Sequence, residues 1–221
     1  MQLARALAAV KRAVEHLEKL YPGGQIPPQE RFDHGYPYMK EYNDLETQER
    51  HAFNYDTFQP YEERFLFHVR RPDGTNLLLK FVKQYSEEAH EFCAKRGRAP
   101  KLFGFQRLVG GWFMVVMEYL QDFRSWSYHP KSAHEELRGF ISEYHRHGFV
   151  HGDIRKPNIL VSSSDNTDFR LIDFDWAGRH GTARYPSKIN PEIPWPEGVD
   201  VHALIEFEHD VQMLDYLISD S

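Results

Sequence analysis

Three side chains with hard oxygen atoms stand close together in the second half of the chain. Asp153 and Asn158 are five residues apart in the segment HGDIRKPNILV, and Asp173 follows Asn158 by fifteen residues. Mg²⁺ binds a few such oxygens and keeps its remaining positions for water and phosphate. An acid outside the metal sphere can accept the proton of a hydroxyl that attacks phosphorus. The pattern therefore indicates phosphoryl-transfer chemistry, with turn and cap residues as the alternative.

A lysine in the first half of the chain is a further chemical candidate. The segments 64–70 (RFLFHVR) and 76–83 (NLLLKFVK) are rich in β-forming residues and flank a Pro-Asp-Gly turn, which predicts a β-hairpin. Side chains alternate along a strand, so Lys80 shares one face with Leu78 and Val82. Taken alone, this position favours a lysine that reaches solvent at the strand edge.

Apolar spacing and turn residues predict the elements that must position these groups. The best helix spans 132–147, where Ser132 and Glu135 form a capping box. Residues 22–60 are polar and aromatic without a clear period, which predicts an irregular lead-in with one strand. The other expected elements are a helix at 86–96, a buried strand at 112–117, short strands at 159–161 and 169–172, and a last helix at about 201–218.

In this order the segments resemble the protein-kinase-like superfamily. HGDIRKPNILV is similar to its catalytic loop, LIDFDWAG to its magnesium loop, and MVVMEYL (114–120) to the strand and hinge that meet adenine. The resemblance covers residues 60–217. It implies transfer of the terminal phosphoryl group of ATP to a hydroxyl, with ATP and Mg²⁺ as cofactors.

The resemblance implies a role for each matched residue. Asp153 would be the catalytic base, and Asn158 and Asp173 would be the metal ligands. Arg155 would place a positive charge against the transferring phosphate, where protein-serine kinases often have a lysine. Lys80 is similar to the lysine of the third strand that binds the α- and β-phosphates.

The resemblance also implies two supporting contacts. An acid of the helix at 86–96 would hold Lys80; we choose Glu88, with Glu87 and Glu91 remaining open. Asp210, in the segment EHDVQMLDYL, would brace the catalytic loop.

The hinge segment would complete the nucleotide site. Met117 would border the adenine pocket. The backbone of Glu118, Tyr119 and Leu120 would offer hydrogen bonds to the base.

The chain departs from the family pattern in several places. Gly152 replaces the arginine with which many protein kinases bind a phosphorylated activation loop, and an H-G-D loop is more typical of small-molecule kinases and small atypical protein kinases. Asp175 stands where a glycine is usual; we interpret it as a solvated or helix-capping acid, with a metal ligand as the alternative. No glycine lies between Gly35 and Gly74, so the G-x-G-x-x-G lid is missing.

Composition excludes several classes of protein. The chain has 221 residues, of which 41% are hydrophobic and 27% charged, as in globular domains. A net charge of −6 argues against a nucleic-acid partner, and no apolar stretch is long enough to cross a bilayer. A single cysteine, Cys93, excludes an internal disulfide framework. We expect an intracellular, cytoplasmic protein without a membrane partner.

The first twenty residues predict an amphipathic helix. Leu3, Leu7, Val10 and Val14 recur at alternating spacings of four and three, which places them on one stripe. This stripe would pack on the chain itself or dock a partner. A mitochondrial targeting helix is the alternative, because residues 1–14 carry basic and no acidic side chains.

We expect an α+β, two-lobed protein-kinase-like fold, similar to small kinase-like proteins found in fungi. Residues 1–60 would form the N-terminal helix and lead-in, 61–120 a small β-rich lobe with the hinge, and 121–221 a shortened helical lobe. The expected activity is phosphoryl transfer to a hydroxyl of a protein or a small molecule. The alternative is a pseudokinase, which binds nucleotide or protein as a scaffold without turnover.

Overall fold

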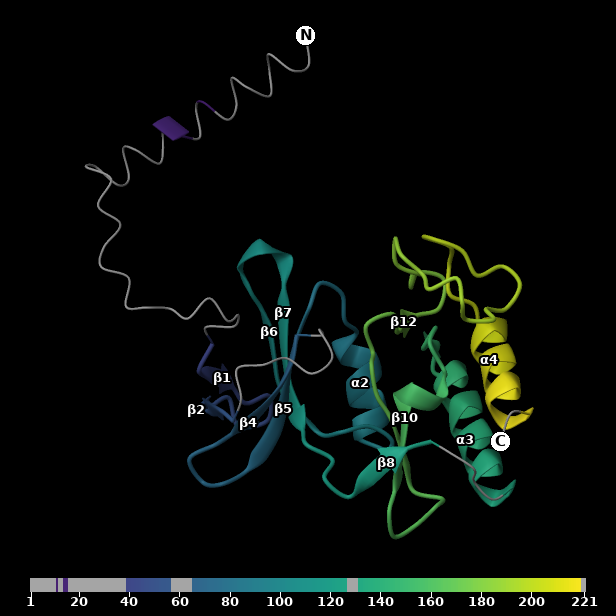
Figure 1. Cartoon of the computed structure of the whole chain (residues 1–221), viewed down its shortest axis with the longest axis horizontal. Helices are drawn as coiled ribbons and strands as arrows, with labels where there is room; N and C mark the ends of the chain where they lie inside the picture. The colour runs from purple at the N-terminus through teal and green to yellow at the C-terminus, as the bar shows by residue number, and fades with distance from the viewer. Residues whose placement is uncertain (1–10, 12–13, 16–38, 57–64, 127–130, 220–221) are drawn as a thin grey trace. The chain divides into compact units, whose positions relative to one another are not determined.

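The computed structural model describes residues 11, 14–15, 39–56, 65–126 and 131–219 (Figure 1). Contacts divide the chain into two units, residues 1–37 and 38–221. In the first unit the described residues are helical, and Lys11 Nζ lies 3.9 Å from Glu15 Oε1, one helical turn away. The rest of the expected helix at 1–20 lies outside the described residues.

A five-stranded antiparallel sheet dominates residues 39–118. The predicted hairpin is present, and its turn is closed by the Arg71 nitrogen, which donates to the Thr75 oxygen at 2.9 Å. Leu77 and Leu79 are fully buried on one face of the second hairpin strand, as the alternation predicts. The strands, in spatial order, are β3 (Asn54–Tyr55), β4 (Leu66–Arg70), β5 (Asn76–Val82), β7 (Phe113–Glu118) and β6 (Leu102–Arg107).

The expectation of an irregular lead-in up to residue 60 is wrong for the part that the structure describes. Strands β1 (Glu41–Asn43) and β2 (Arg50–Ala52) pair with each other, and β3 joins the main sheet. Tyr42 and Phe53 are buried in the same core as β4 and β5. The observed boundary therefore falls at 37/38, because these aromatic side chains pack on the sheet.

Three α-helices lie in the described part of this unit: α2 (Glu87–Ala94), α3 (Lys131–Arg146) and α4 (Phe207–Ser219). Figure 1 shows α3 and α4 beside each other, and Leu137 of α3 and Leu214 of α4 belong to one buried cluster. Since α3 includes Lys131, Ser132 lies inside the helix and is not its N-cap. The last helix begins at 207 rather than 201, because residues 203–205 are extended and hydrogen-bond to 183–185.

Two small sheets hold the segments that carry the candidate chemistry. Strand β9 (Phe149–Val150) pairs with β12 (Gly178–Arg179), and β10 (Ile159–Ser162) lies between β8 (Phe123–Ser125) and β11 (Phe169–Leu171). The segment 151–158 therefore connects two anchored strands, and so does the segment 172–177. Among the described residues, no helix combines the length and apolar character needed to cross a membrane.

Candidate active site

A buried carboxylate fixes the start of the segment 151–158. Asp210, in the first turn of α4, has no exposed surface. Its two oxygens accept hydrogen bonds from the backbone nitrogens of His151 and Gly152, each at 2.7 Å. Hydrogen bonds to a charged acceptor are stronger than neutral ones, so this contact holds the backbone firmly. The geometry is the bracing contact expected for Asp210.

Gly152 is required by the shape of this turn. Its φ angle of +77° lies in the left-handed region, and an added Cβ would stand 2.7 Å from Ile205 Cδ1. No larger side chain fits there without a shift of Ile205. The resemblance leads us to expect an arginine at position 152. The left-handed backbone and the contact with Ile205 explain why this chain has glycine there.

The expected base and one expected metal ligand are in direct contact. The Asn158 amide Nδ2 donates to Asp153 Oδ2 at 2.6 Å and to the Asp153 carbonyl at 3.0 Å. Both residues are buried. The Arg155 guanidinium makes a two-point contact with the same carboxylate, with Nη2 2.8 Å from Oδ2 and Nε bonded to Oδ1. Asp153 is therefore held in one orientation from two sides.

The second expected metal ligand follows β11 in a tight loop. Asp173 has a φ angle of +67°, which a non-glycine residue adopts only where its surroundings hold it. The preceding nitrogen, of Ile172, donates to the Asn158 carbonyl at 3.0 Å. This bond joins the segment of Asp173 to the segment of Asp153.

Lys80 reaches this loop from the sheet. Its Nζ lies 2.6 Å from Asp173 Oδ1 and 2.6 Å from Asp175 Oδ1, and its side chain is only 13% exposed. The ring of Tyr85 lies beneath it, with 5.9 Å between Nζ and the ring centroid. The structure thus brings Lys80 to Asp173, and it excludes the expectation of a lysine that reaches solvent.

The three charged groups shift one another's pKa values. Burial lowers the pKa of Lys80, but the two carboxylates outweigh this and raise it overall. Burial raises the pKa of Asp175 to about 7, and the negative charge of Asp173 adds to this rise against the pull of Lys80. In Asp173 the attraction of Lys80 outweighs burial, so its pKa is lowered.

The choice of Glu88 as the partner of Lys80 is wrong for this structure. Glu88 pairs with Arg179 of β12, whose Nε lies 3.1 Å from Glu88 Oε2. Ser86 caps α2, which places Glu88 in the first turn, on the side of Arg179. Glu91 pairs instead with Lys95 at 2.6 Å.

Asp175 takes the place that was expected for a helix acid, and its interpretation as a solvated or capping acid is also wrong. Its side chain is 28% exposed and is paired with Lys80. The available sequence signal was its position two residues after Asp173, which lets both carboxylates reach one cation.

A cavity of about 160 Å³ ends at Lys80 and Asp173. The four residues that were expected at the adenine pocket, from Met117 to Leu120, all line it. Sequence reasoning missed its apolar walls and one aromatic residue, because they come from distant segments. These residues are Leu66, Leu78, Tyr85, Pro100, Leu160 and Ile172.

A buried histidine supports the loop at 173–175. The ring of His90 in α2 stacks on Phe174, with centroids 4.7 Å apart and 5° between the planes. Its Nε2 lies 2.8 Å from the Pro100 carbonyl, which can only accept, so Nδ1 accepts from the Tyr85 hydroxyl at 2.6 Å. Burial lowers the pKa of His90 to about 4, so the ring is neutral near pH 7.

The donor set fits a magnesium ion better than a transition metal. The described residues include no group of three or more His, Cys, Asp or Glu side chains that could hold a metal. Mg²⁺ needs only one or two carboxylates beside phosphate and water. The carboxylates of Asp173 and Asp175 already converge on one positive charge, the ammonium of Lys80.

Comparisons with known proteins give structural likenesses and no family. No protein-family model and no curated protein matches the sequence. The structure is similar to the kinase PK-1 of the Cydia pomonella granulovirus, with 15% identity and a TM-score of 0.44 over 53% of this chain and 49% of that one. It is also similar to vaccinia related kinase 3, with 15% identity and a TM-score of 0.47 over 83% and 67%. The match to the first spans about half of that kinase, and neither likeness identifies an activity or a substrate.

The buried His90 predicts a loss of stability in acid. Because its folded pKa of about 4 lies below the ordinary 6.5, the unfolded chain takes up a proton first as the pH falls. Stability is therefore complete above pH 6.5 and declines toward pH 4. Between pH 7 and 4.5, His90 should account for about 2–3 kcal/mol of the lost free energy of unfolding.

Urea unfolding of the wild type and His90→Gln at both pH values measures this effect. The variant starts less stable, but its pH dependence should be smaller by that amount. Equal pH dependence of the two proteins would contradict a neutral, buried His90.

Proposed function

We propose that this chain is a phosphotransferase that moves the terminal phosphoryl group of Mg-ATP to a hydroxyl acceptor. Its fold would be a minimal protein-kinase-like one, with the sheet-rich region as the small lobe and the region of α3 and α4 as a shortened large lobe. The observation that carries the proposal is the contact of Lys80 with Asp173 at the end of a cavity, one backbone hydrogen bond away from the pair Asp153–Asn158.

The small cavity is the proposed site of the adenine ring. Leu66 and Leu78 on the sheet side and Leu160 on the other side give it two apolar walls. A flat aromatic base between such walls is removed from water on both faces. Residues 118–120 also line this space. The Glu118 nitrogen already donates to the Lys101 carbonyl and the Tyr119 carbonyl already accepts from Gln121, so the nitrogens of Tyr119 and Leu120 are the proposed donors to the base.

Lys80 and the metal ligands are the proposed phosphate site. Asn158 and Asp173 would hold Mg²⁺, which supplies positive charge against the phosphate oxygens when it is bound. Lys80 would then move from Asp173 to the phosphates and stay beside Asp175. Asp175 would remain the acid that keeps the ammonium in place, since no acid of α2 contacts Lys80 in the described structure.

Asp153 is the proposed base. As the acceptor oxygen forms a bond to the terminal phosphorus, the bond from that phosphorus to the bridging oxygen breaks, and ADP leaves with the electron pair. The acceptor proton passes to Asp153. Arg155, already beside Asp153, would place its charge against the transferring group.

One observation favours the alternative, a scaffold without turnover. The Asp153 carboxylate is occupied by Arg155 and Asn158, and Lys80 by two acids, so the site is fully paired without nucleotide. A pseudokinase could keep this network permanently for stability. A measurement of ATP turnover distinguishes the phosphotransferase from the scaffold.

Mg-ATP should raise the melting temperature of the wild type. Saturation at about 100 times the dissociation constant adds about 2.7 kcal/mol, which corresponds to about 5–11 °C for a chain of this size. Release of ADP should accompany the shift. Asp153→Asn should abolish ADP release and keep most of the shift, because the residue does not line the nucleotide cavity.

Asp215→Asn is the matched control, because its carboxylate lies on the surface, 2.8 Å from Arg138. It should keep both signals. A melting shift without ADP release in the wild type would establish the scaffold, and the absence of any shift at millimolar Mg-ATP would contradict nucleotide binding altogether.

Asp175 should matter more than Glu88 for nucleotide binding. At pH 8.5, above the raised pKa of Asp175, Asp175→Asn removes the charge that holds Lys80, so the dissociation constant for ATP should rise about tenfold, or about 1.4 kcal/mol. Glu88→Gln removes an exposed ion pair with Arg179 and should change the dissociation constant for ATP less than about twofold. Titration calorimetry with ATP measures the dissociation constants of both variants, and EDTA in the buffer removes the metal.

The melting temperature of each apo-variant shows whether it is folded. A loss of affinity in Glu88→Gln with none in Asp175→Asn would contradict the assignment of Asp175. That result would assign to Glu88 the role of holding Lys80.

A further inference from the structure

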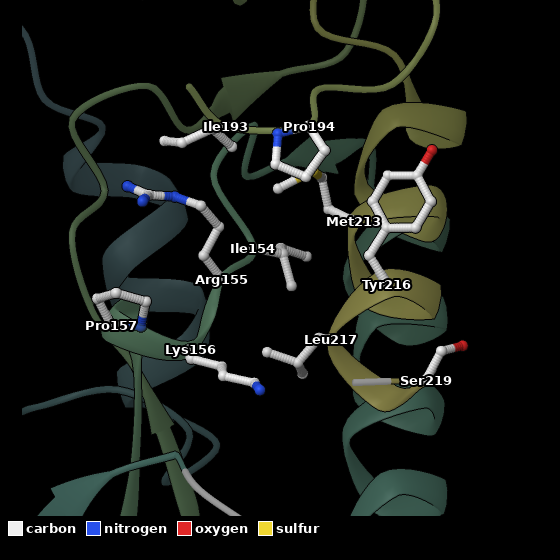
Figure 2. Close-up of a pocket in the computed structure, with 10 residues that line it drawn as sticks. All are labelled: Ile154, Arg155, Lys156, Pro157, Ile193, Pro194, Met213, Tyr216, Leu217 and Ser219. Carbon is white, nitrogen blue, oxygen red and sulfur yellow. The ribbon is translucent and has the colours of Figure 1, made fainter. Parts of the chain in front are cut away.

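The cavity between the loop of Asp153 and α4 has its charged groups already engaged. Its volume is about 620 Å³, and Figure 2 shows Ile154 on one side of it and Leu217 of α4 on the other. Arg155 lines this cavity but holds the Asp153 carboxylate, and Lys156 also has a partner. Neither cation is therefore free to select a ligand.

A different cavity, of about 500 Å³, is lined by Asp175, the acid that holds Lys80. This volume lies within the range of pockets that bind small molecules. The lining comes from the end of β5, from the loop that follows β11, and from the segment that precedes α4. It includes Val82, Lys83, Asp175, Trp176, Arg184 and Tyr185.

One wall of this cavity is fixed by contacts within the chain. Tyr185 is 1% exposed, and its hydroxyl lies 3.2 Å from His209 Nδ1. The Tyr185 nitrogen donates to the Ala203 carbonyl at 3.0 Å, which holds the backbone of this segment. The ring of Trp176 packs edge-on against Tyr185, with centroids 5.8 Å apart. Together with Val82, these side chains form a preformed apolar wall.

Two cations line the same cavity and have no acid partner among the described residues. The Arg184 guanidinium donates from Nη1 to the His202 carbonyl at 2.9 Å. Lys83 Nζ donates to the Gly110 carbonyl at 2.6 Å and lies 4.3 Å from the centroid of the Trp112 ring. A backbone carbonyl orients a cation but does not neutralise it.

Asp175 is the one acid among the described lining residues, and it is already paired. Its Oδ1 lies 2.6 Å from Lys80 Nζ. The charges of Lys83 and Arg184 therefore remain for a ligand. A guanidinium presents parallel N–H donors that match two oxygens of a carboxylate or a phosphate. An oxyanion is the ligand group that this lining favours.

We propose that this cavity binds a small organic anion. Its carboxylate or phosphate group lies at Arg184, in the positive field of Lys83, and its aromatic or aliphatic body lies against Tyr185 and Trp176. The site shares no described lining residue with the adenine cavity. Binding of the anion therefore does not depend on the proposed function.

The position of Asp175 predicts that the anion and the nucleotide affect each other. Asp175 lines the anion cavity, and Lys80, 2.6 Å away, lines the adenine cavity. Negative ligands in the two cavities therefore come close enough to repel each other, and each should weaken the binding of the other by about threefold. This consequence rests on the proposed nucleotide site.

Three probes of similar size test the selection. They are 4-methylbenzoate, 4-methylphenyl phosphate and the neutral 4-methylbenzyl alcohol. Dissociation constants measured by ligand-observed NMR with the full chain should be about tenfold lower for the two anions than for the alcohol. The ratio between the two anions shows which oxyanion the site prefers.

Removal of the guanidinium should remove the selection. Arg184→Gln should weaken both anions by about tenfold and leave the alcohol unchanged. Arg138→Gln is the matched control, because Arg138 pairs with Asp215 on the surface of the helices, 2.8 Å away, and does not line the cavity. It should change each constant by less than about twofold.

Ser187→Glu provides a second variant if Arg184→Gln does not fold. Ser187 is exposed and lines the cavity, so the added carboxylate should weaken both anions by about threefold or more. Val211→Glu adds the same charge at an exposed position of α4 that does not line the cavity. It should leave both constants unchanged.

A titration of ATP and EDTA into samples with 4-methylbenzoate measures the coupling. The dissociation constant of the anion should rise to a plateau about threefold above its starting value, as for two sites that can be occupied together. A constant that rises without limit would show that ATP excludes the anion. The cavity would then belong to the phosphates of the nucleotide.

Three results would overturn the proposal: equal binding of the anions and the alcohol, equal effects of Arg184→Gln and Arg138→Gln, or exclusion of the anion by ATP. If any of them occurs while Mg-ATP still raises the melting temperature, the proposed function stands and only the anion site fails. If the anions bind as expected and Mg-ATP has no effect, the anion site stands and the proposed function fails.

Discussion

The structure depends on one buried cation that is shared by two carboxylates. An ammonium held away from water costs several kcal/mol unless it is paired, so Lys80 needs the acids at 173 and 175. Because Lys80 lies on β5 and the acids lie after β11, their contact connects the sheet to the region of the helices. A nucleotide that takes Lys80 away from Asp173 would exchange one of these ion pairs for another. The contact of Lys80 with these acids therefore contributes both to the stability of the fold and to the proposed function.

A second buried carboxylate, that of Asp210, holds a segment of the backbone in place. Asp210 fixes the turn at 151–152, and that turn sets where Asp153 and Ile154 point. The turn therefore fixes both the proposed base and the next residue, Ile154, which packs in the main buried cluster.

Much of this arrangement follows from local sequence rules, and part of it does not. The period of two along β5 placed Lys80 on the correct face, and the resemblance to the protein-kinase-like superfamily implied that Asp153, Asn158 and Asp173 lie together. The partner of Lys80 depends on where α2 starts, which spacing does not determine. Strands β1, β2 and β6 are short or irregular in polarity, so they carry no clear period. Cavity walls built from several distant segments require the tertiary fold.

An experimental structure with Mg²⁺ and a non-hydrolysable ATP analogue tests the central claim most directly. We expect the base between Leu78 and Leu160, the phosphates at Lys80, and the metal at Asn158 and Asp173. Nucleotide bound elsewhere, or a Lys80 that stays on its two acids beside an ordered triphosphate, would contradict the assignment.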